Sequence, residues 1–235
     1  MKKIFIMLFF GFIIFIFFFN LHNKNIVEDS LLENDGDYVV LLHGLGRSSF
    51  SMQKIGRELA DKGYKVLNID YPSRQDNIEN LVDKYLKKEL AEKCTDKSKK
   101  INFVTHSMGG IMVRYLLLNN NIENIGRIVM LAPPNQGSNL ADRLVNNKII
   151  AYILGPALGE LMIDKNSFTN KLGPINYEIG IIAGQYDNKV SVEEAKLDEM
   201  ADFVVVPKIH TWIMNNGEVI DLLINFLDKG KFSVE

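Results

Sequence analysis

The stretch NFVTHSMGGI, residues 102–111, decides the fold that the sequence predicts. Its first half is an apolar run typical of a strand, its second half begins a helix-like run, and Ser107 lies between them. A strand that turns sharply into a helix strains the residue at its tip and needs small neighbours, which Gly109 and Gly110 supply. The helix N-terminus that follows favours negative charge near the serine oxygen. Ser107 is therefore a candidate nucleophile.

One residue departs from the usual form of this turn, Gly-x-Ser-x-Gly. Thr105 stands where the first glycine is expected. A β-branched residue suits the end of a strand. We therefore expect Thr105 to tighten the turn and to leave Ser107 in place.

Working outward, strand-like and helix-like segments alternate from Asp37 onward. The strand-like runs cover residues 38–42, 65–69, 101–105, 127–132, 177–184 and 202–207, and the helix-like runs cover about 50–62, 77–92, the stretch after Ser107, 191–200 and 216–228. This order predicts an α/β domain over residues 37–230, with a mostly parallel sheet of about six strands and helices on both faces. Sites in such sheets form at the carboxyl ends of the strands.

Residues 138–172 interrupt this alternation. They contain helical patches but no strand, so we interpret them as a small helical insertion. Two roles remain open at this point: a lid over an active site, or extra helices that only pack against the domain.

Composition limits the classes of function. The chain has 235 residues, 47% of them hydrophobic, which suffices for one domain with a full core. A net charge of −2 gives no electrostatic reason to expect nucleic acid as a partner. The single Cys94 and four scattered histidines show no metal-ligand spacing, so neither a metal nor a cofactor is expected. Nothing in the sequence specifies the oligomeric state.

The N-terminus has the layout of an export signal. Lys2 and Lys3 precede an unbroken apolar run over residues 4–19. We interpret residues 1–21 as a signal anchor or a signal peptide, and the absence of an Ala-x-Ala-like site after them favours the anchor. Residues 22–36 then form a tether. In both cases the domain is expected on the extracytoplasmic side, with the membrane as a partner of the anchor.

A serine nucleophile needs a general base and an acid that orients it. His210 is the only histidine after Ser107, and it follows the last predicted strand. Asp187 follows residues 177–184, again at a carboxyl end, and lies between serine and histidine in the sequence. The rival carboxylates, Asp198 and Asp202, precede the last strand, which places them toward the opposite edge of the sheet.

An acyl-transfer site also needs donors for an oxyanion. The backbone N–H groups of Met108 and of Leu45, in the loop HGLGR after the first strand, are suitably placed. A glycine-rich loop can instead bind phosphate, but this loop has neither the Gly-x-Gly-x-x-Gly spacing nor a Gly-Lys-Ser/Thr ending. A nucleotide site is therefore not expected.

These motifs resemble the α/β-hydrolases, and in particular bacterial lipases and esterases with HGLG and HSMGG motifs. VVLLHGLGRSS, DYPSR, FVTHSMGG, LAPPNQGS, AGQYDNKVSVEEAKL and IHTWIM occur in the order of that family. The resemblance implies Ser107 as nucleophile, Asp187 as acid, His210 as base, and Leu45 with Met108 as oxyanion donors. It implies hydrolysis of carboxylic esters through an acyl-enzyme.

Other activities remain open. A thioesterase, amidase or acyltransferase would use the same triad, and a non-catalytic binding module would use only the scaffold. An ester or lipid-like substrate would need an apolar wall that binds its acyl chain. The alternative role of the residues that could form such a wall is ordinary core packing. Candidates are Trp212, Leu154 and Leu158, together with Met108, Ile111, Leu161 and Met162.

Overall fold

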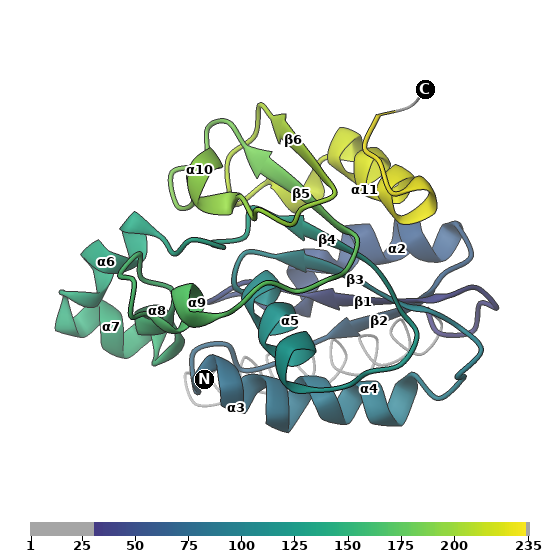
Figure 1. Cartoon of the computed structure of the whole chain (residues 1–235), viewed down its shortest axis with the longest axis horizontal. Coiled ribbons are helices and arrows are strands. Elements are labelled where there is room, and N and C mark those ends of the chain that lie inside the picture. The colour runs from purple at the N-terminus through teal and green to yellow at the C-terminus, as the bar shows by residue number, and fades with distance from the viewer. Residues whose placement is uncertain (1–30, 234–235) are drawn as a thin grey trace, which may run out of the picture.

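Six parallel strands form one sheet in the order β2-β1-β3-β4-β5-β6 in the computed structural model, which describes residues 31–233 (Figure 1). The strands are β1 (Tyr38–Leu42), β2 (Lys65–Ile69), β3 (Ile101–His106), β4 (Ile125–Leu131), β5 (Ile179–Gly184) and β6 (Asp202–Val206). The predicted sheet is confirmed. The predicted 127–132 strand begins earlier, at Ile125.

The strands are continuous apolar runs because both faces of the sheet are covered. Consecutive side chains point to opposite faces, so Val39 and Leu41 join one core cluster while Val40 and Leu42 join the other. Helices α2 (Gln53–Asp61) and α11 (Gly217–Lys229) cover the first face. The second face is covered by α3 (Ile78–Leu81), the π-helical turn η2 (Val82–Leu86), α4 (Lys87–Lys93) and α5 (Met108–Asn119).

Local signals account for the ends of the last helix. Asn216 accepts a hydrogen bond from the N–H of Val219 at the start of α11, and Gly230 ends the helix in the left-handed conformation. Short 3-10 turns, η1 (Ser49–Met52) and η3 (Ile213–Asn215), precede α2 and α11.

Two helices differ from the sequence prediction. The helix expected over 77–92 contains the π-helical turn η2 between α3 and α4. The helix expected over 191–200 is the single turn α10 (Val192–Ala195). Ser191 and Glu194 form a capping box at its start, and Lys196 already has extended backbone (φ −69, ψ 152). The prediction was too long because apolar spacing does not show where the backbone leaves the helix.

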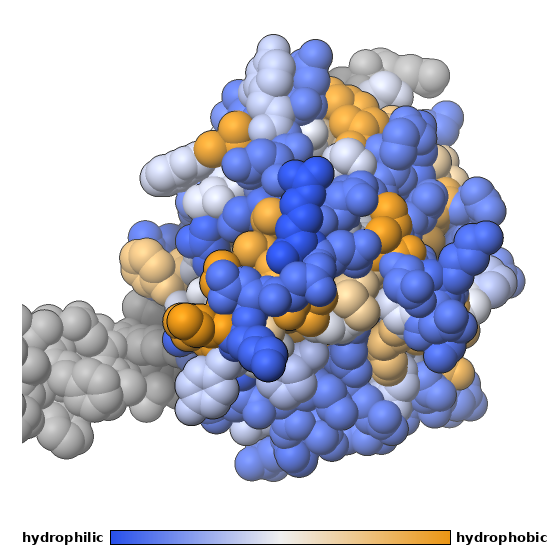
Figure 2. Space-filling model, turned by 90° about the vertical axis from the view of Figure 1, so that its left-hand side faces the viewer, coloured by the Kyte–Doolittle hydropathy of each residue, from blue (hydrophilic) through white to orange (hydrophobic). Residues whose placement is uncertain are grey.

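The helical insertion lies between β4 and β5. It comprises α6 (Asn139–Val145), α7 (Lys148–Leu154), α8 (Ala157–Glu160) and α9 (Phe168–Lys171). It is fastened to the domain near α3, where Glu160 Oε2 accepts a hydrogen bond from the N–H of Ile78 at 2.6 Å. Figure 2 looks onto this side of the molecule, where apolar side chains lie among polar ones.

The N-terminal segment, residues 1–21, lies outside the described residues, as does most of the tether. From residue 31 to residue 233, no helix combines the length and apolar character needed to cross a membrane.

Candidate active site

Four loops bring the candidate residues together at the carboxyl ends of the strands. Leu45 follows β1, Ser107 follows β3, Asp187 follows β5 and His210 follows β6. All of these strands are parallel, so their carboxyl ends meet at the same edge. The residues come from distant parts of the sequence but share one side of the domain.

Ser107 lies at a strained turn between β3 and α5. Its backbone has φ 54 and ψ −123, a region that non-glycine residues rarely adopt. Its N–H donates to the carbonyl of Leu131 at 2.9 Å. A Cβ on Gly109 would lie 2.7 Å from the carbonyl oxygen of Leu42, so only glycine lets α5 begin this close to the end of β1.

Thr105 fits because of a second glycine. Its side chain is fully buried, and within residues 31–233 its hydroxyl has no hydrogen-bond partner. A Cβ on Gly110 would lie 3.4 Å from that hydroxyl. The space that the threonine occupies at the turn is thus left by Gly110, the third residue of α5.

Asp187 and His210 are joined directly. His210 Nδ1 lies 2.6 Å from Asp187 Oδ2, and both side chains are almost wholly buried. The other oxygen of Asp187 accepts hydrogen bonds from the N–H groups of Lys189 and Val190 at 2.8 and 2.9 Å. These backbone donors stabilise the carboxylate as an anion and fix its direction toward the imidazole.

The rival carboxylates lie elsewhere. Asp202 lies at the amino end of β6, away from the carboxyl ends of the strands. Its oxygens accept hydrogen bonds from the N–H groups of Phe203 and Phe232. Asp198 is exposed to solvent.

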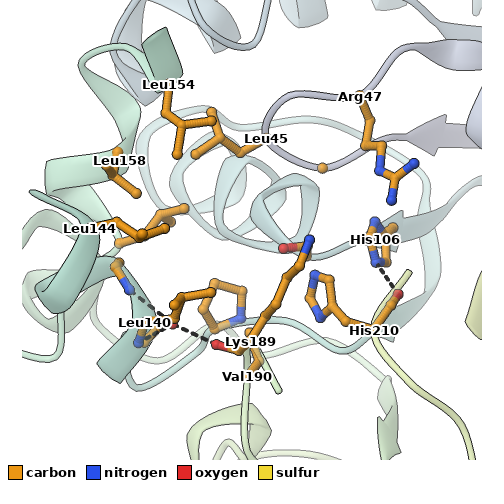
Figure 3. A pocket seen from close by; sticks show the side chains of 16 residues that line it. Leu45, Arg47, His106, Leu140, Leu144, Leu154, Leu158, Lys189, Val190 and His210 are labelled. Carbon is orange, nitrogen blue, oxygen red and sulfur yellow. Dashed lines mark hydrogen bonds between the residues drawn. The ribbon is translucent and has the colours of Figure 1, made fainter. Parts of the chain in front are cut away.

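His106 occupies the space beside His210. Its Nε2–H donates to the backbone carbonyl of His210 at 3.1 Å, and the two imidazole rings are 4.7 Å apart (Figure 3). Burial lowers the pKa of His106 well below its ordinary value, and the neighbouring His210 lowers it further. The ring is therefore neutral, with its proton on Nε2, because the carbonyl can only accept.

The loop that carries Leu45 rests on a buried pair of rings. His43 stacks on Tyr71 with ring centroids 4.0 Å apart, and the phenol of Tyr71 donates a short hydrogen bond to the carbonyl of His43. Burial raises the pKa of Tyr71, which keeps this donor protonated. Gly44 then passes close to the turn, since its Cβ would lie 3.0 Å from the Cβ of Ser107.

The two candidate oxyanion donors, the N–H groups of Met108 and Leu45, donate no backbone hydrogen bond in the loops and turns of the described chain. The N–H of Met108 is the first in α5 and so has no acceptor inside the helix. Among the backbone hydrogen bonds of loops and turns in residues 31–233, neither Met108 nor Leu45 appears as a donor.

A cavity of about 160 Å³ opens at this point. Ser107 and His210 both line it, although no hydrogen bond joins their side chains within the described part of the chain. The insertion supplies much of its wall, and Figure 3 shows the leucines together on one side. The apolar residues from the insertion are Leu140, Ala141, Leu144, Leu154, Leu158 and Leu161.

The predicted substrate-binding residues divide into two groups. Leu154 and Leu158 line the cavity. Trp212 is 63% exposed and is not among the lining residues. Met108 and Ile111 are fully buried in the core and do not line the cavity either, which agrees with a packing role for their side chains.

Two basic side chains at the cavity were missed by the sequence reasoning. Arg47 lies two residues after Leu45, and Lys189 lies two residues after Asp187. A charged residue within two positions of a candidate site residue was the available signal. Burial lowers the pKa of Lys189, and the positive charge of Arg47 lowers it further.

Comparisons with known proteins agree with this fold. A family model described as "alpha/beta hydrolase fold" matches residues 37–149. Triacylglycerol lipase 2 of Saccharomyces cerevisiae is 30% identical over 135 residues, which are 53% of this chain and 39% of that protein. The chain thus spans well under half the length of this curated relative.

Two solved structures are similar over most of both chains. The mature lipase BlEst2 of Bacillus licheniformis has a TM-score of 0.58 and 19% identity, and covers 83% of this chain and 92% of its own. An esterase of Exiguobacterium antarcticum has a TM-score of 0.60 and 13% identity, with coverages of 83% and 93%. The chain has the α/β-hydrolase fold, which is also the fold that the family model over residues 37–149 describes.

Proposed function

We propose that the chain is a serine hydrolase that cleaves carboxylic esters, with Ser107, His210 and Asp187 as its triad. The observation that carries the proposal is the 2.6 Å hydrogen bond between Asp187 and His210 beside a cavity that Ser107 also lines. A buried carboxylate fixed on an imidazole, with a serine at a strained turn nearby, is the arrangement that nucleophilic acyl transfer requires.

The chemistry follows from which nitrogen carries the proton. With Nδ1–H directed at Asp187, the free Nε2 of His210 accepts the proton as the Ser107 oxygen attacks the ester carbonyl. The oxyanion that forms is stabilised by the N–H groups of Leu45 and Met108. The C–O bond to the alcohol breaks, and His210 returns its proton to that oxygen. Water, activated by the same imidazole, then releases the acid from the acyl-enzyme.

The apolar wall supports an apolar acyl group. Five leucines of the insertion face the cavity, whose volume of about 160 Å³ is below the roughly 300–1,000 Å³ of most ligand pockets. We therefore assign short acyl chains to this cavity. The similar proteins are named as lipases and an esterase, which favours oxygen esters over thioesters or amides as substrates. We also propose that the chain belongs to the bacterial lipase and esterase families with HGLG and HSMGG motifs.

A fluorophosphonate probe tests the triad. Wild type is expected to be labelled and to hydrolyse 4-nitrophenyl butyrate, while Ser107→Ala does neither. A matched control is Ser98→Ala, which removes a serine from the loop before β3, at the opposite edge of the sheet. Labelling that persists in Ser107→Ala would remove that residue from the mechanism. A folded wild type that is never labelled would show a binding module instead.

A substrate panel separates the related activities. Butyryl oxygen ester, thioester and amide are compared, each with and without an alcohol acceptor. The highest kcat/KM is expected for the oxygen ester, with water as acceptor. A higher value for another member would reassign the enzyme to that class.

The same proposal includes a location. We infer from Lys2, Lys3 and the apolar run after them that residues 1–21 hold the domain on the extracytoplasmic side of a membrane. Mass spectrometry of the mature N-terminus and protease accessibility in intact cells test it. A domain that stays protected inside the cell would contradict it.

A further inference from the structure

The cavity is divided into an apolar side and a basic side. Figure 3 shows Leu140, Leu144, Leu154 and Leu158 on one side, with Arg47, His106 and His210 opposite them. The side chain of Lys189 extends between the two groups, next to His210. A substrate that fills this space meets hydrocarbon at one end and positive charge at the other.

The two basic side chains form no ion pair with any residue from 31 to 233, although the charge of Asp187 partly offsets the lowering of the Lys189 pKa. Within residues 31–233 no ion pair or hydrogen bond involves the guanidinium of Arg47 or the ammonium of Lys189, and no carboxylate lies within 4.0 Å of either. Both are partly buried. Asp187 is the nearest candidate partner by sequence, but its oxygens already accept hydrogen bonds from His210, Lys189 N–H and Val190 N–H.

Their backbones are held firmly at the site. The N–H of Lys189 donates to Asp187 at 2.8 Å, and its carbonyl accepts from the hydroxyl of Ser138 at 2.6 Å. The N–H of Arg47 closes a turn onto the carbonyl of Gly44 at 3.2 Å. These backbone hydrogen bonds fix the positions from which the Arg47 and Lys189 side chains extend beside the candidate triad.

We propose that Arg47 and Lys189 bind an anionic group on the alcohol part of the ester. The inference rests on the proposed function, because it uses the direction of the reaction. His210 returns the proton to the leaving alcohol, so the alcohol lies on the histidine side of Ser107. Lys189 lies on that side, while the leucines face the acyl side (Figure 3). A phosphate is the group that two such cations fit best, since it offers several acceptor oxygens to them.

The experiment compares three soluble esters with the same hexanoyl length. One is hexanoylglycerol, the second is hexanoylglycerol phosphate, and the third carries a carboxylate at the far end of its acyl chain. Wild type is expected to show at least a tenfold higher kcat/KM for the phosphate than for the neutral ester, with no such gain for the third. The gain should shrink as salt concentration rises.

The variants are Lys189→Gln and Arg47→Gln. Each is expected to lower the ratio of kcat/KM values, phosphate over neutral, by about tenfold, mainly through KM. Lys189→Arg keeps the charge and should keep most of the ratio. The matched control is Lys165→Gln, an exposed lysine of the insertion that does not line the cavity, and it should leave the ratio unchanged.

The outcomes are separable. If wild type hydrolyses the neutral ester but gains nothing from the phosphate, this inference is wrong and the proposed function stands. An equal gain from the acyl-end carboxylate overturns the placement on the alcohol side. If none of the three esters is hydrolysed by a folded protein, the proposed function itself fails.

Discussion

The ring of His106 holds the backbone of His210: the Nε2–H of the first donates to the carbonyl of the second at 3.1 Å. The residue next to the candidate nucleophile thus fixes the loop that carries the candidate base. Its other ring nitrogen has no hydrogen-bond partner among the described residues. The bond joins the last residue of β3 to the loop after β6, 104 positions further along the chain.

We expect His106→Ala to lower kcat because the imidazole of His210 loses a support. A displacement of about 1 Å at a catalytic group can cost about 10²-fold in rate, so a loss of about ten- to a hundredfold is expected, with KM little changed. His106→Asn keeps an N–H donor and should recover part of it. Steady-state kinetics on a short ester measure both, and equal losses in the two variants would contradict a positioning role.

The same residue makes stability depend on pH. The unfolded chain binds a proton at His106 near pH 6.5, while the folded chain does so only at much lower pH. The unfolded state therefore binds more protons than the folded state below about pH 6.5. As the pH decreases in that range, the free energy of unfolding falls by up to about 1.4 kcal/mol for each pH unit. The free energy of unfolding, measured by urea titration at pH 5, 6 and 7, should depend less steeply on pH in His106→Asn than in wild type. Identical slopes would contradict the assignment.

Ser107→Gly should be more stable than Ser107→Ala. Both lack the hydroxyl, but only alanine keeps a Cβ at φ 54. The strain relieved is about 1–3 kcal/mol, and the greater freedom of glycine in the unfolded state offsets about 0.5–1 kcal/mol of it. We expect a difference of about 1 kcal/mol by denaturant titration. A less stable glycine variant would show that the turn is not strained.

Thr105→Val should preserve or raise stability. The buried hydroxyl has no partner within the described chain, so an isosteric methyl removes a desolvation cost of about 1–3 kcal/mol. Gly110→Ala is the opposing variant, because its new Cβ would lie 3.2 Å from Pro133 and 3.4 Å from the Thr105 hydroxyl. It should lower the melting temperature. Loss of stability in Thr105→Val would indicate a hydrogen bond to that hydroxyl.

Leu154→Ala should shift the preference toward longer acyl chains. Leu154 lines the cavity and is only partly buried, so its truncation adds room at modest cost to stability. Leu158→Ala makes the same change at a side chain that is 3% exposed. It should lower the free energy of unfolding by about 2–5 kcal/mol. Rates across butyrate to decanoate esters measure the shift. An unchanged profile in both variants would place the acyl chain elsewhere.

The sheet could be predicted because each strand is a mostly apolar run, and Ser107, Asp187 and His210 each follow one. The hydrogen bond between Asp187 and His210 agrees with that order. The cavity wall could not be predicted in the same way. Leu154 lines the cavity although it is far in sequence from every residue of the candidate triad, and Trp212 does not line it although it lies two positions after His210. Both outcomes depend on how α7 and the loop after β6 pack.

The basic side of the cavity was missed for a different reason. The local signal at Arg47 and Lys189, a charge within two positions of a candidate site residue, is too common to separate them from ordinary surface charges. Their position follows from loops after β1 and β5, two strands that are not neighbours in the sheet. Only the completed sheet brings these loops together.

The strand order also sets when activity returns during refolding. Strands β1, β2 and β3 come first in the chain, but the loop that carries the candidate base, His210, follows β6. Among the described strands, β6 is an edge strand that pairs only with β5. The β5–β6 pairing is local, with Gly180 opposite Asp202, but β5 joins the rest of the sheet across the helical insertion, with Ile128 opposite Ile179. Closing that longer loop is entropically slow. Esterase activity should therefore reappear after most helical signal has recovered, and its rate should report the joining of β5 and β6 to the rest of the sheet.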